Sequence, residues 1–209
     1  MNVLQRIGLL ALVGIAWLCA DLASAQQDVK KNTKFPQTVL IIRHAEKTGE
    51  KGDIHLSKKG VERADVLHKL FEMSKERAKP FPTPDFIFAA ANDKSSQRPL
   101  ETVTPLAKSL KLTIHEKFDS KLPKAEEKTG MHKLRDEIFG ESKYFGKTIL
   151  VSWRHKSICE LAKTLKATNA PTKWEDEVFD RVFQISYDDQ GTATFANLPQ
   201  RLLPGDSEK

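Results

Sequence analysis

Three short stretches of the chain are almost continuous runs of apolar side chains. They lie at Thr38–Ile42, Asp85–Ala91 and Thr148–Ser152, and each is followed by polar residues. A short apolar run without polar alternation is typical of a strand that is buried on both faces. These stretches therefore predict three strands of a largely parallel sheet.

Helical spacing of apolar residues appears between these runs. Ser57 is a good N-cap residue, and Leu56 and Val61 occupy the two positions of a hydrophobic staple. A helix is therefore expected to start after Ser57, with Val61 on its inner face. The apolar positions that define the three clearest helices are Val61, Ala64, Leu67 and Phe71; Leu100, Val103, Ala107 and Leu110; and Ile158, Leu161, Ala162 and Leu165.

The boundaries of the other elements are less regular. Pro105 lies inside the second helical pattern, and its missing amide hydrogen predicts a kink or an early break. Ser157 and Glu160 have the spacing of a capping box, which predicts a helix start there. Leu112–Ile114 suggests a short edge strand. The charged stretch 115–146 is ambiguous, with some helix expected near 131–139.

The C-terminal region has a different pattern. Phe183, Ile185 and Tyr187 alternate with polar residues, and the turn residues Asp188–Gly191 predict a hairpin with the stretch that follows. Elsewhere strands alternate with helices. The prediction is an α/β fold: a three-layer α/β/α sandwich with a mostly parallel central sheet. No linker or repeat divides residues 37–209, so we expect a single domain.

Residues 1–25 have the features of a signal peptide. A basic start is followed by an apolar run of about 14 residues, shorter than the roughly 20 that a membrane span requires, and Ala23-Ser24-Ala25 fits a cleavage site. We expect export to the periplasm or the medium, with no stable membrane insertion after cleavage; an uncleaved anchor is the alternative. Residues 26–36 form a polar lead-in. Cleavage leaves Cys159 as the single cysteine, which excludes an intrachain disulfide; its apolar neighbours predict a small buried hydrophobic side chain.

The formal net charge is +6 at pH 7, which suits an anionic partner. The lysines, however, are scattered among acidic residues rather than collected in one stripe. Nucleic-acid binding would favour clustered basic residues with stacking aromatics, and the sequence shows no such cluster. The charge therefore favours a small anionic substrate over nucleic acid.

Basic residues and histidines follow the predicted strands. Arg43-His44 follows the first strand, Arg98 follows the second and Arg154-His155 follows the third. Ligands of open α/β folds bind beyond the carboxyl ends of strands, and helix N-termini there favour anions. Arginine binds phosphate through two parallel hydrogen bonds, and a neutral imidazole can attack phosphorus. These residues are sufficient to bind and transfer a phosphoryl group without a metal or cofactor.

The neighbouring residues have simpler interpretations. Strand alternation favours a structural role for Arg154, directed away from the site, and Lys47 is expected in a solvated loop. His55, His68, His115 and His132 do not have the spacing of a standard metal-binding motif, so structural or solvated roles are favoured.

Four motifs in order resemble those of the histidine phosphatase superfamily, whose members have the phosphoglycerate mutase-like fold. They are IIRHAEK, HLSKKGVERADVL, SSQRPLETVTPLA and ILVSWRHKSICELA, and together they span about 36–166. The resemblance implies that His44 is the phosphorylated nucleophile. It implies that Arg43, Arg98 and His155 complete the phosphate site and that the mechanism is metal-free. The expected activity is hydrolysis of a phosphomonoester.

The resemblance does not identify the general acid. Glu116 and Asp119 are the candidates in HEKFDSKLPKAEE, with Glu126 further away and with Glu46 and Asp93 as outside possibilities. Two alternatives therefore stay open. One is a mutase-like phosphotransferase, which export disfavours, and the other is a phosphate-binding protein without catalytic activity.

Overall fold

The computed structural model describes residues 34–208, except for 76, 125 and 126. The expected signal peptide and most of the polar lead-in therefore lie outside the described residues. None of the helices in the described part of the chain combines the length and the apolar character that a membrane crossing requires.

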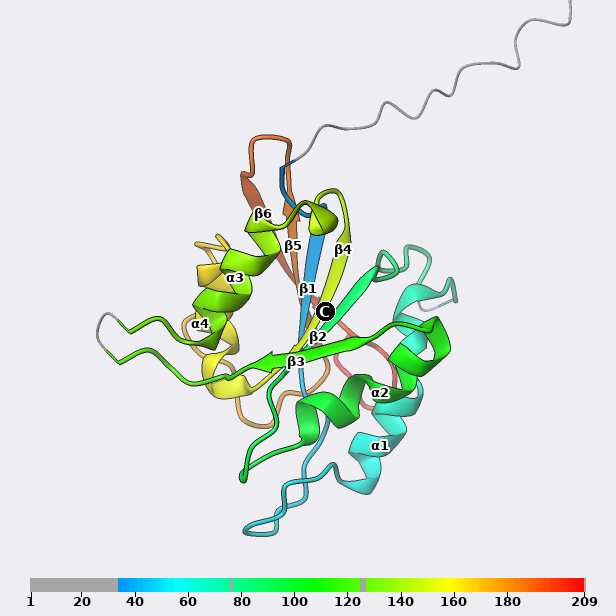
Figure 1. The fold of residues 1–209 in the computed structure, drawn as a ribbon. Helices are drawn as coiled ribbons and strands as arrows, with labels where there is room; N and C mark the ends of the chain where they lie inside the picture. The colour runs from blue at the N-terminus through cyan, green and yellow to red at the C-terminus, as the bar shows by residue number, and fades with distance from the viewer. Residues whose placement is uncertain (1–33, 76, 125–126, 209) are drawn as a thin grey trace, which may run out of the picture. The chain divides into compact units, whose positions relative to one another are not determined.

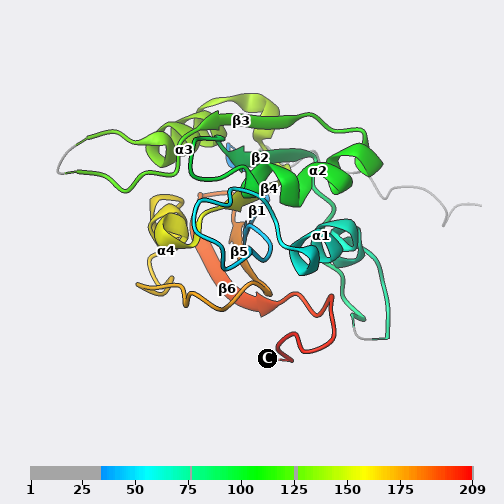
Figure 2. The same ribbon diagram turned by 90° about the horizontal axis from the view of Figure 1, so that it is seen from below.

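A six-stranded sheet forms the centre of the domain, in the order β3-β2-β4-β1-β5-β6 (Figures 1 and 2). Strands β1 to β4 run parallel to one another, and β5 pairs antiparallel with both β1 and β6. The sheet is thus mostly parallel, with a hairpin at one edge as the alternating pattern predicted. The strands are β1 (Thr38–Arg43), β2 (Phe86–Ala90), β3 (Ile114–Phe118), β4 (Thr148–Trp153), β5 (Arg181–Tyr187) and β6 (Ala193–Pro199).

Helices cover both faces of this sheet, which confirms the α/β/α sandwich. In Figure 2, α3 and α4 lie on one side of the row of strands, and α1 and α2 lie on the other. Alternate residues of β1 serve the two layers: Val39 and Ile41 pack toward α3 and α4, whereas Leu40 and Ile42 pack toward α2. The α-helices are α1 (Lys58–Asp65), α2 (Arg98–Leu110), α3 (Gly130–Gly140) and α4 (His155–Thr164); Leu67–Phe71 and Ser142–Tyr144 form short 3₁₀ helices.

The register of the two central strands brings the two histidine motifs together. Strands β1 and β4 are neighbours, and Arg43 lies opposite Trp153. The amide of His44 donates to the carbonyl of Trp153 at 2.9 Å, so the ladder continues one residue past β1. His44 and His155 therefore leave the sheet at the same edge, although more than a hundred residues separate them in the chain.

The start of α1 explains the motif HLSKKG. The Ser57 hydroxyl accepts a hydrogen bond from the Gly60 amide at 3.1 Å, which confirms the predicted N-cap. A Cβ at Gly60 would lie 2.2 Å from the carbonyl oxygen of Glu46, so only glycine permits this close approach. The inner-face prediction for Val61 was wrong, because its side chain is 48% exposed.

Two helix boundaries differ from the sequence predictions. Helix α2 continues through Pro105 without the early break, because buried Val103 and Leu106 hold it against the sheet despite the backbone hydrogen bond that proline cannot make. Helix α4 begins at His155 rather than at a Ser157 cap. The Ser157 hydroxyl instead accepts from Trp153 Nε1 at 3.1 Å and donates to the carbonyl of Ser120 at 2.8 Å.

Candidate active site

His44 follows β1 directly and is only 3% exposed. Its Nδ1 lies 2.8 Å from the carbonyl oxygen of Ala45. Because a carbonyl can only accept, Nδ1 must carry the hydrogen, and Nε2 of the neutral ring keeps its lone pair. Burial lowers the pKa of His44 to about 3, and the charges of Arg43 and Arg98 lower it further in the same direction. His44 is therefore neutral at pH 7, with an unprotonated Nε2.

Arg43 lies behind His44 at the end of β1 and is 1% exposed. Its Nη1 donates to the carbonyls of Asp176 and Val178 at 2.5 and 2.9 Å, and its guanidinium lies 3.7 Å from the centre of the Phe179 ring. Burial lowers the pKa of Arg43 to about 10, so the group stays charged at neutral pH. Its Nε and Nη2 are buried and have no hydrogen-bond partner among the described residues.

Arg98 is the first residue of α2. Its Nη1 donates to the carbonyl of Asp53 at 2.8 Å and its Nη2 to that of Ser95 at 3.4 Å. Its Nε is buried and unpartnered within the described part of the chain. Arg43 and Arg98 therefore share one property. Each guanidinium donates hydrogen bonds to neutral backbone carbonyls, and each keeps at least one buried N–H without a partner among the described residues, which could donate to an anion.

His155 opens α4, and its ring centre lies 6.4 Å from that of His44. Burial lowers the pKa of His155 to about 4, and the charge of Arg43 contributes. Its Nε2 is 3.3 Å from Oδ1 of Asp176, and its Nδ1 is buried without a partner in the described structure. Both histidines of the site are thus neutral at pH 7.

The structure corrects the prediction for Arg154, which lines the same cavity as His44 and His155 instead of pointing away. The alternation argument failed because β4 ends at Trp153, so the strand pattern no longer applies one residue later. Arg154 pairs with Asp93 at 2.8 Å and donates to the Ser95 hydroxyl at 3.2 Å. It thereby ties the loop that leads to Arg98 to the start of α4. Lys47 is exposed, as expected, and also lines the cavity.

A cavity of about 830 Å³ lies beside the two histidines, and Arg43 is not among its lining residues. His44, Arg98, Arg154 and His155 form part of its lining, and the segment from Asp119 to Lys133 forms another part. Sequence reasoning did not assign the 119–133 segment to the site beyond the candidate acids. It also did not predict that backbone carbonyls in 175–178 accept hydrogen bonds from Arg43. Any residue type can supply a backbone carbonyl, so the sequence carries no signal for such a contact.

Three helices begin at the edge of this cavity, at Arg98, at Gly130 after Thr129, and at His155. A helix N-terminus carries a partial positive charge that favours acidic residues in the first turn. Helices α3 and α4 have no acidic residue there. Arg98 and Lys156 instead place cations at the starts of α2 and α4, although α2 also has Glu101 in its first turn. Helix N-termini with cations beside them are suited to an anion.

The candidate general acids differ in where they lie relative to the cavity. Asp119 lines the cavity and accepts a hydrogen bond from the Lys121 amide at 3.0 Å. Glu116 is exposed on β3 and is not among the lining residues. Asp93 is paired with Arg154, which lowers the pKa of its carboxyl. Glu46 is bound to Arg63, and Glu126 lies outside the described residues.

The remaining histidines and Cys159 do not join the site. His55 contacts Glu101, His68 contacts the Asp65 carbonyl, and His132 caps its own helix. No group of three or more metal-binding side chains is close enough to hold an ion within the described residues. Cys159 is 5% exposed, and burial raises the pKa of its thiol.

Neither a family model nor a curated protein matches the chain, but solved structures do. The protein histidine phosphatase SixA, complexed with tungstate, is 13% identical with a TM-score of 0.52, and the match covers 78% of this chain and 97% of SixA. Phosphoglycerate mutase from Plasmodium falciparum is 14% identical with a TM-score of 0.50, covering 83% of this chain and 97% of the mutase. Mycobacterial hydrolase 1 is 11% identical with a TM-score of 0.53, covering 80% of this chain and all of the hydrolase, at 100%.

At these identities the likeness establishes the fold. The chain therefore has the fold of phosphoglycerate mutase, which is the fold that its four motifs predicted.

Proposed function

We propose that this chain is a phosphatase that hydrolyses a small phosphomonoester through a phosphohistidine intermediate on His44. One observation carries the proposal. His44 is a neutral imidazole whose Nδ1 is held by the Ala45 carbonyl, so its Nε2 lone pair is free in a cavity bordered by arginine. The SixA structure, which has this fold, contains tungstate, an oxyanion like phosphate.

In the proposed first step, Nε2 of His44 attacks phosphorus as the bond to the leaving oxygen breaks. Arg43, Arg98 and His155 bind the equatorial oxygens, on which negative charge accumulates. A general acid protonates the leaving alkoxide. The deprotonated acid then takes a proton from a water molecule as its oxygen attacks phosphorus and the bond to Nε2 breaks. This step releases phosphate and restores neutral His44 and the protonated acid. The guanidinium groups supply the positive charge, so no step requires a metal ion.

We propose Asp119 as the general acid, because it lines the cavity and Glu116 does not. Asp119→Asn should lower kcat for an alkyl phosphate by roughly 10²- to 10⁴-fold, the usual contribution of a positioned acid. Glu116→Gln is the matched control and should change kcat by less than about twofold. A larger loss in Glu116→Gln than in Asp119→Asn would reverse the assignment.

The mechanism is tested by hydrolysis of p-nitrophenyl phosphate. His44→Ala should lose at least about 10⁴-fold in kcat, the scale seen when a nucleophile is removed. His68→Ala, which removes a half-buried imidazole on the 3₁₀ helix Leu67–Phe71 outside the cavity, is the control and should retain wild-type turnover. Acid-labile phosphate on His44 should be trapped by rapid alkaline quenching. Turnover by His44→Ala at the wild-type rate would exclude the mechanism.

The same assay separates the two alternatives. Phosphate binding without turnover at any pH would indicate a non-catalytic phosphate-binding protein. Transfer of the phosphoryl group to a second alcohol in preference to water would indicate a phosphotransferase.

We further propose that the domain acts after export and that cleavage follows Ala25. The basis is the order of basic start, apolar run and small residues in residues 1–25. N-terminal sequencing of protein recovered from the periplasm or medium should begin at Gln26. Recovery of the full-length chain in the membrane fraction would favour the uncleaved anchor.

A further inference from the structure

The cavity is much larger than a single phosphate group requires, and its lining is strongly cationic. Eight lysine or arginine side chains line it, against three carboxylates. Arg98 and Arg154 lie beside the two histidines. The other six are lysines: Lys47, Lys121, Lys124, Lys128, Lys133 and Lys156.

Most of these lysines lack a counter-charge. Within the described residues, only Lys128 among them pairs with a carboxylate, that of Asp136 at 3.6 Å. The Asp93 carboxylate is already bound to Arg154. Some lysines outside the cavity do pair with carboxylates, as in the pairs Lys117–Glu137 and Lys147–Asp85. We call Lys121, Lys124 and Lys133 the lysine wall; all three are exposed and come from the 119–133 segment.

The segment that carries the lysine wall is anchored close to the two histidines. The Ser157 hydroxyl, one turn into the helix that His155 begins, donates to the Ser120 carbonyl at 2.8 Å. A Cβ at Gly130 would lie 2.1 Å from the carbonyl oxygen of Asp119, so the two ends of the segment are in close contact. Lys121 and Lys133 each lie within three residues of these contacts, which fixes where the wall begins and ends.

Leu122 adds an apolar surface between these charges. It is 51% exposed and lines the cavity beside Pro123. Solvated lysines in a surface loop need no exposed leucine among them. Unpaired cations around a small apolar surface are instead suited to a carbon skeleton that carries several anionic groups.

On the basis of the proposed function, we propose that the substrate is a small phosphomonoester with at least one further phosphate group, and that the lysine wall binds this second phosphate. Arg43, Arg98 and His155 bind the phosphate that is transferred. The second phosphate stays outside the reacting centre, so the wall affects which leaving group is accepted rather than the chemical step.

Binding is measured first in His44→Ala, which does not consume the ligand. Fructose 6-phosphate and fructose 1,6-bisphosphate are matched probes, because they share a sugar and differ by one phosphate. Isothermal titration should give a roughly 5- to 30-fold lower Kd for the bisphosphate, as expected for two or three exposed charge pairs acting together. Equal Kd values would overturn the proposal, whether or not the wild-type protein proves to be a phosphatase.

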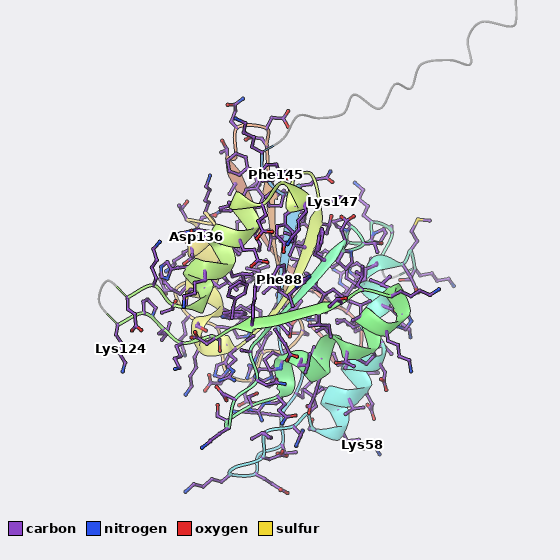
Figure 3. The ribbon with its side chains drawn as sticks, viewed as in Figure 1. Lys58, Phe88, Lys124, Asp136, Phe145 and Lys147 are labelled. Atoms are coloured by element: carbon purple, nitrogen blue, oxygen red, sulfur yellow. The ribbon has the colours of Figure 1, made fainter. Side chains whose placement is uncertain are left out.

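The variant test removes the lysine wall. Lys121→Ala, Lys124→Ala and Lys133→Ala, combined with His44→Ala, should reduce the Kd ratio of the two sugars to below about threefold. A control with the same change in net charge replaces Lys58, Lys79 and Lys108 by alanine; these lysines are exposed and do not line the cavity. Figure 3 labels Lys124 at the tip of its segment and Lys58 at the start of α1, well separated in that view. The control variant should keep the Kd ratio of the two sugars measured without these lysine substitutions. If both triple variants lost the ratio equally, net charge alone would explain it and the proposal would be overturned.

Wild-type kinetics separate failure of this inference from failure of the proposed function. A preference for the bisphosphate in kcat/KM of the same size as the Kd ratio supports both. Turnover of both sugars without preference supports the phosphatase and overturns the lysine wall. A bisphosphate preference in binding without turnover of either sugar or of p-nitrophenyl phosphate supports the wall and overturns the phosphatase.

Discussion

Two buried arginines of this domain have opposite surroundings. Arg43 and Arg63 are 1% and 2% exposed. All three guanidinium nitrogens of Arg63 are hydrogen-bonded, to Glu46 at 2.8–3.1 Å, to Asp206 at 2.8 Å and to Gln200 at 3.2 Å. Arg43 donates only to carbonyls through Nη1 and retains two buried N–H groups without a partner among the described residues.

The pKa values of the two groups reflect this difference. Burial lowers the pKa of Arg43 to about 10, and the charges of Asp176, Glu177 and Glu46 only partly offset this effect. Burial would also lower the pKa of Arg63, but the carboxylates of Asp206 and Glu46 outweigh it and raise the pKa. Arg63 is therefore a structural arginine that joins the segment after β1 to the C-terminal region. Arg43 donates only to neutral carbonyls and keeps two N–H groups without a partner among the described residues, which is what the proposed function requires of it.

The largest effect on stability is expected at Arg63. Arg63→Met leaves the carboxylates of Glu46 and Asp206 without the cation that they share, and only the exposed Lys59 remains near Glu46, at 3.6 Å. The free energy of unfolding should therefore fall by about 3–5 kcal/mol. Urea denaturation measures this loss. Adding Glu46→Gln and Asp206→Asn should recover part of it, because the uncompensated charges are then removed. If Arg63→Met were as stable as the wild type, the contrast between the two arginines would fail.

The next effect is on catalysis, at Arg43. Arg43→Met should lower kcat/KM for p-nitrophenyl phosphate by roughly 10²- to 10³-fold, the loss typical for a group that stabilises developing charge. Its free energy of unfolding should change by less than about 1.5 kcal/mol, because no carboxylate loses its partner. If Arg43→Met lost more stability than Arg63→Met and kept its activity, Arg43 would be the structural arginine and the contrast would be wrong.

A third effect is on the pH dependence of stability. Folding lowers the pKa values of His44 and His155 to about 3 and about 4, below the ordinary value of 6.5. The unfolded chain binds more protons, so the stabilisation is fully present above pH 6.5 and is lost as pH falls toward 4 and then 3. Between pH 6.5 and 5, each histidine should contribute a slope approaching about 1.4 kcal/mol per pH unit.

Urea denaturation across this pH range tests the two histidines together. The double variant His44→Asn, His155→Asn should have a much flatter profile than the wild type. His115, whose pKa burial also lowers, remains in the variant and leaves a small slope of the same sign. An unchanged profile would mean that the two rings titrate in the folded protein as they do in the unfolded chain, and the lowered pKa values of His44 and His155 would then be wrong.

Much of the fold could be predicted because its signals are local. Continuous apolar runs indicated β1, β2 and β4, and alternation indicated the hairpin of β5 and β6. The wrong predictions arose where one local sequence pattern is compatible with two different structures. Ser157 has the spacing of a cap, but Trp153 Nε1 and the Ser120 carbonyl use its hydroxyl instead. Val61 has helical spacing, but that side of α1 faces solvent.

The sequence by itself determined the type of chemistry, because arginine and histidine at the ends of buried strands are suited to phosphate in any arrangement that brings them together. Only the tertiary structure decided which buried arginine is free to bind it. Arg43 and Arg63 are the same residue type, and their difference lies in carboxylates contributed by distant parts of the chain. The same holds for Asp119 and the lysine wall, since a cavity is formed by segments whose proximity no local pattern encodes.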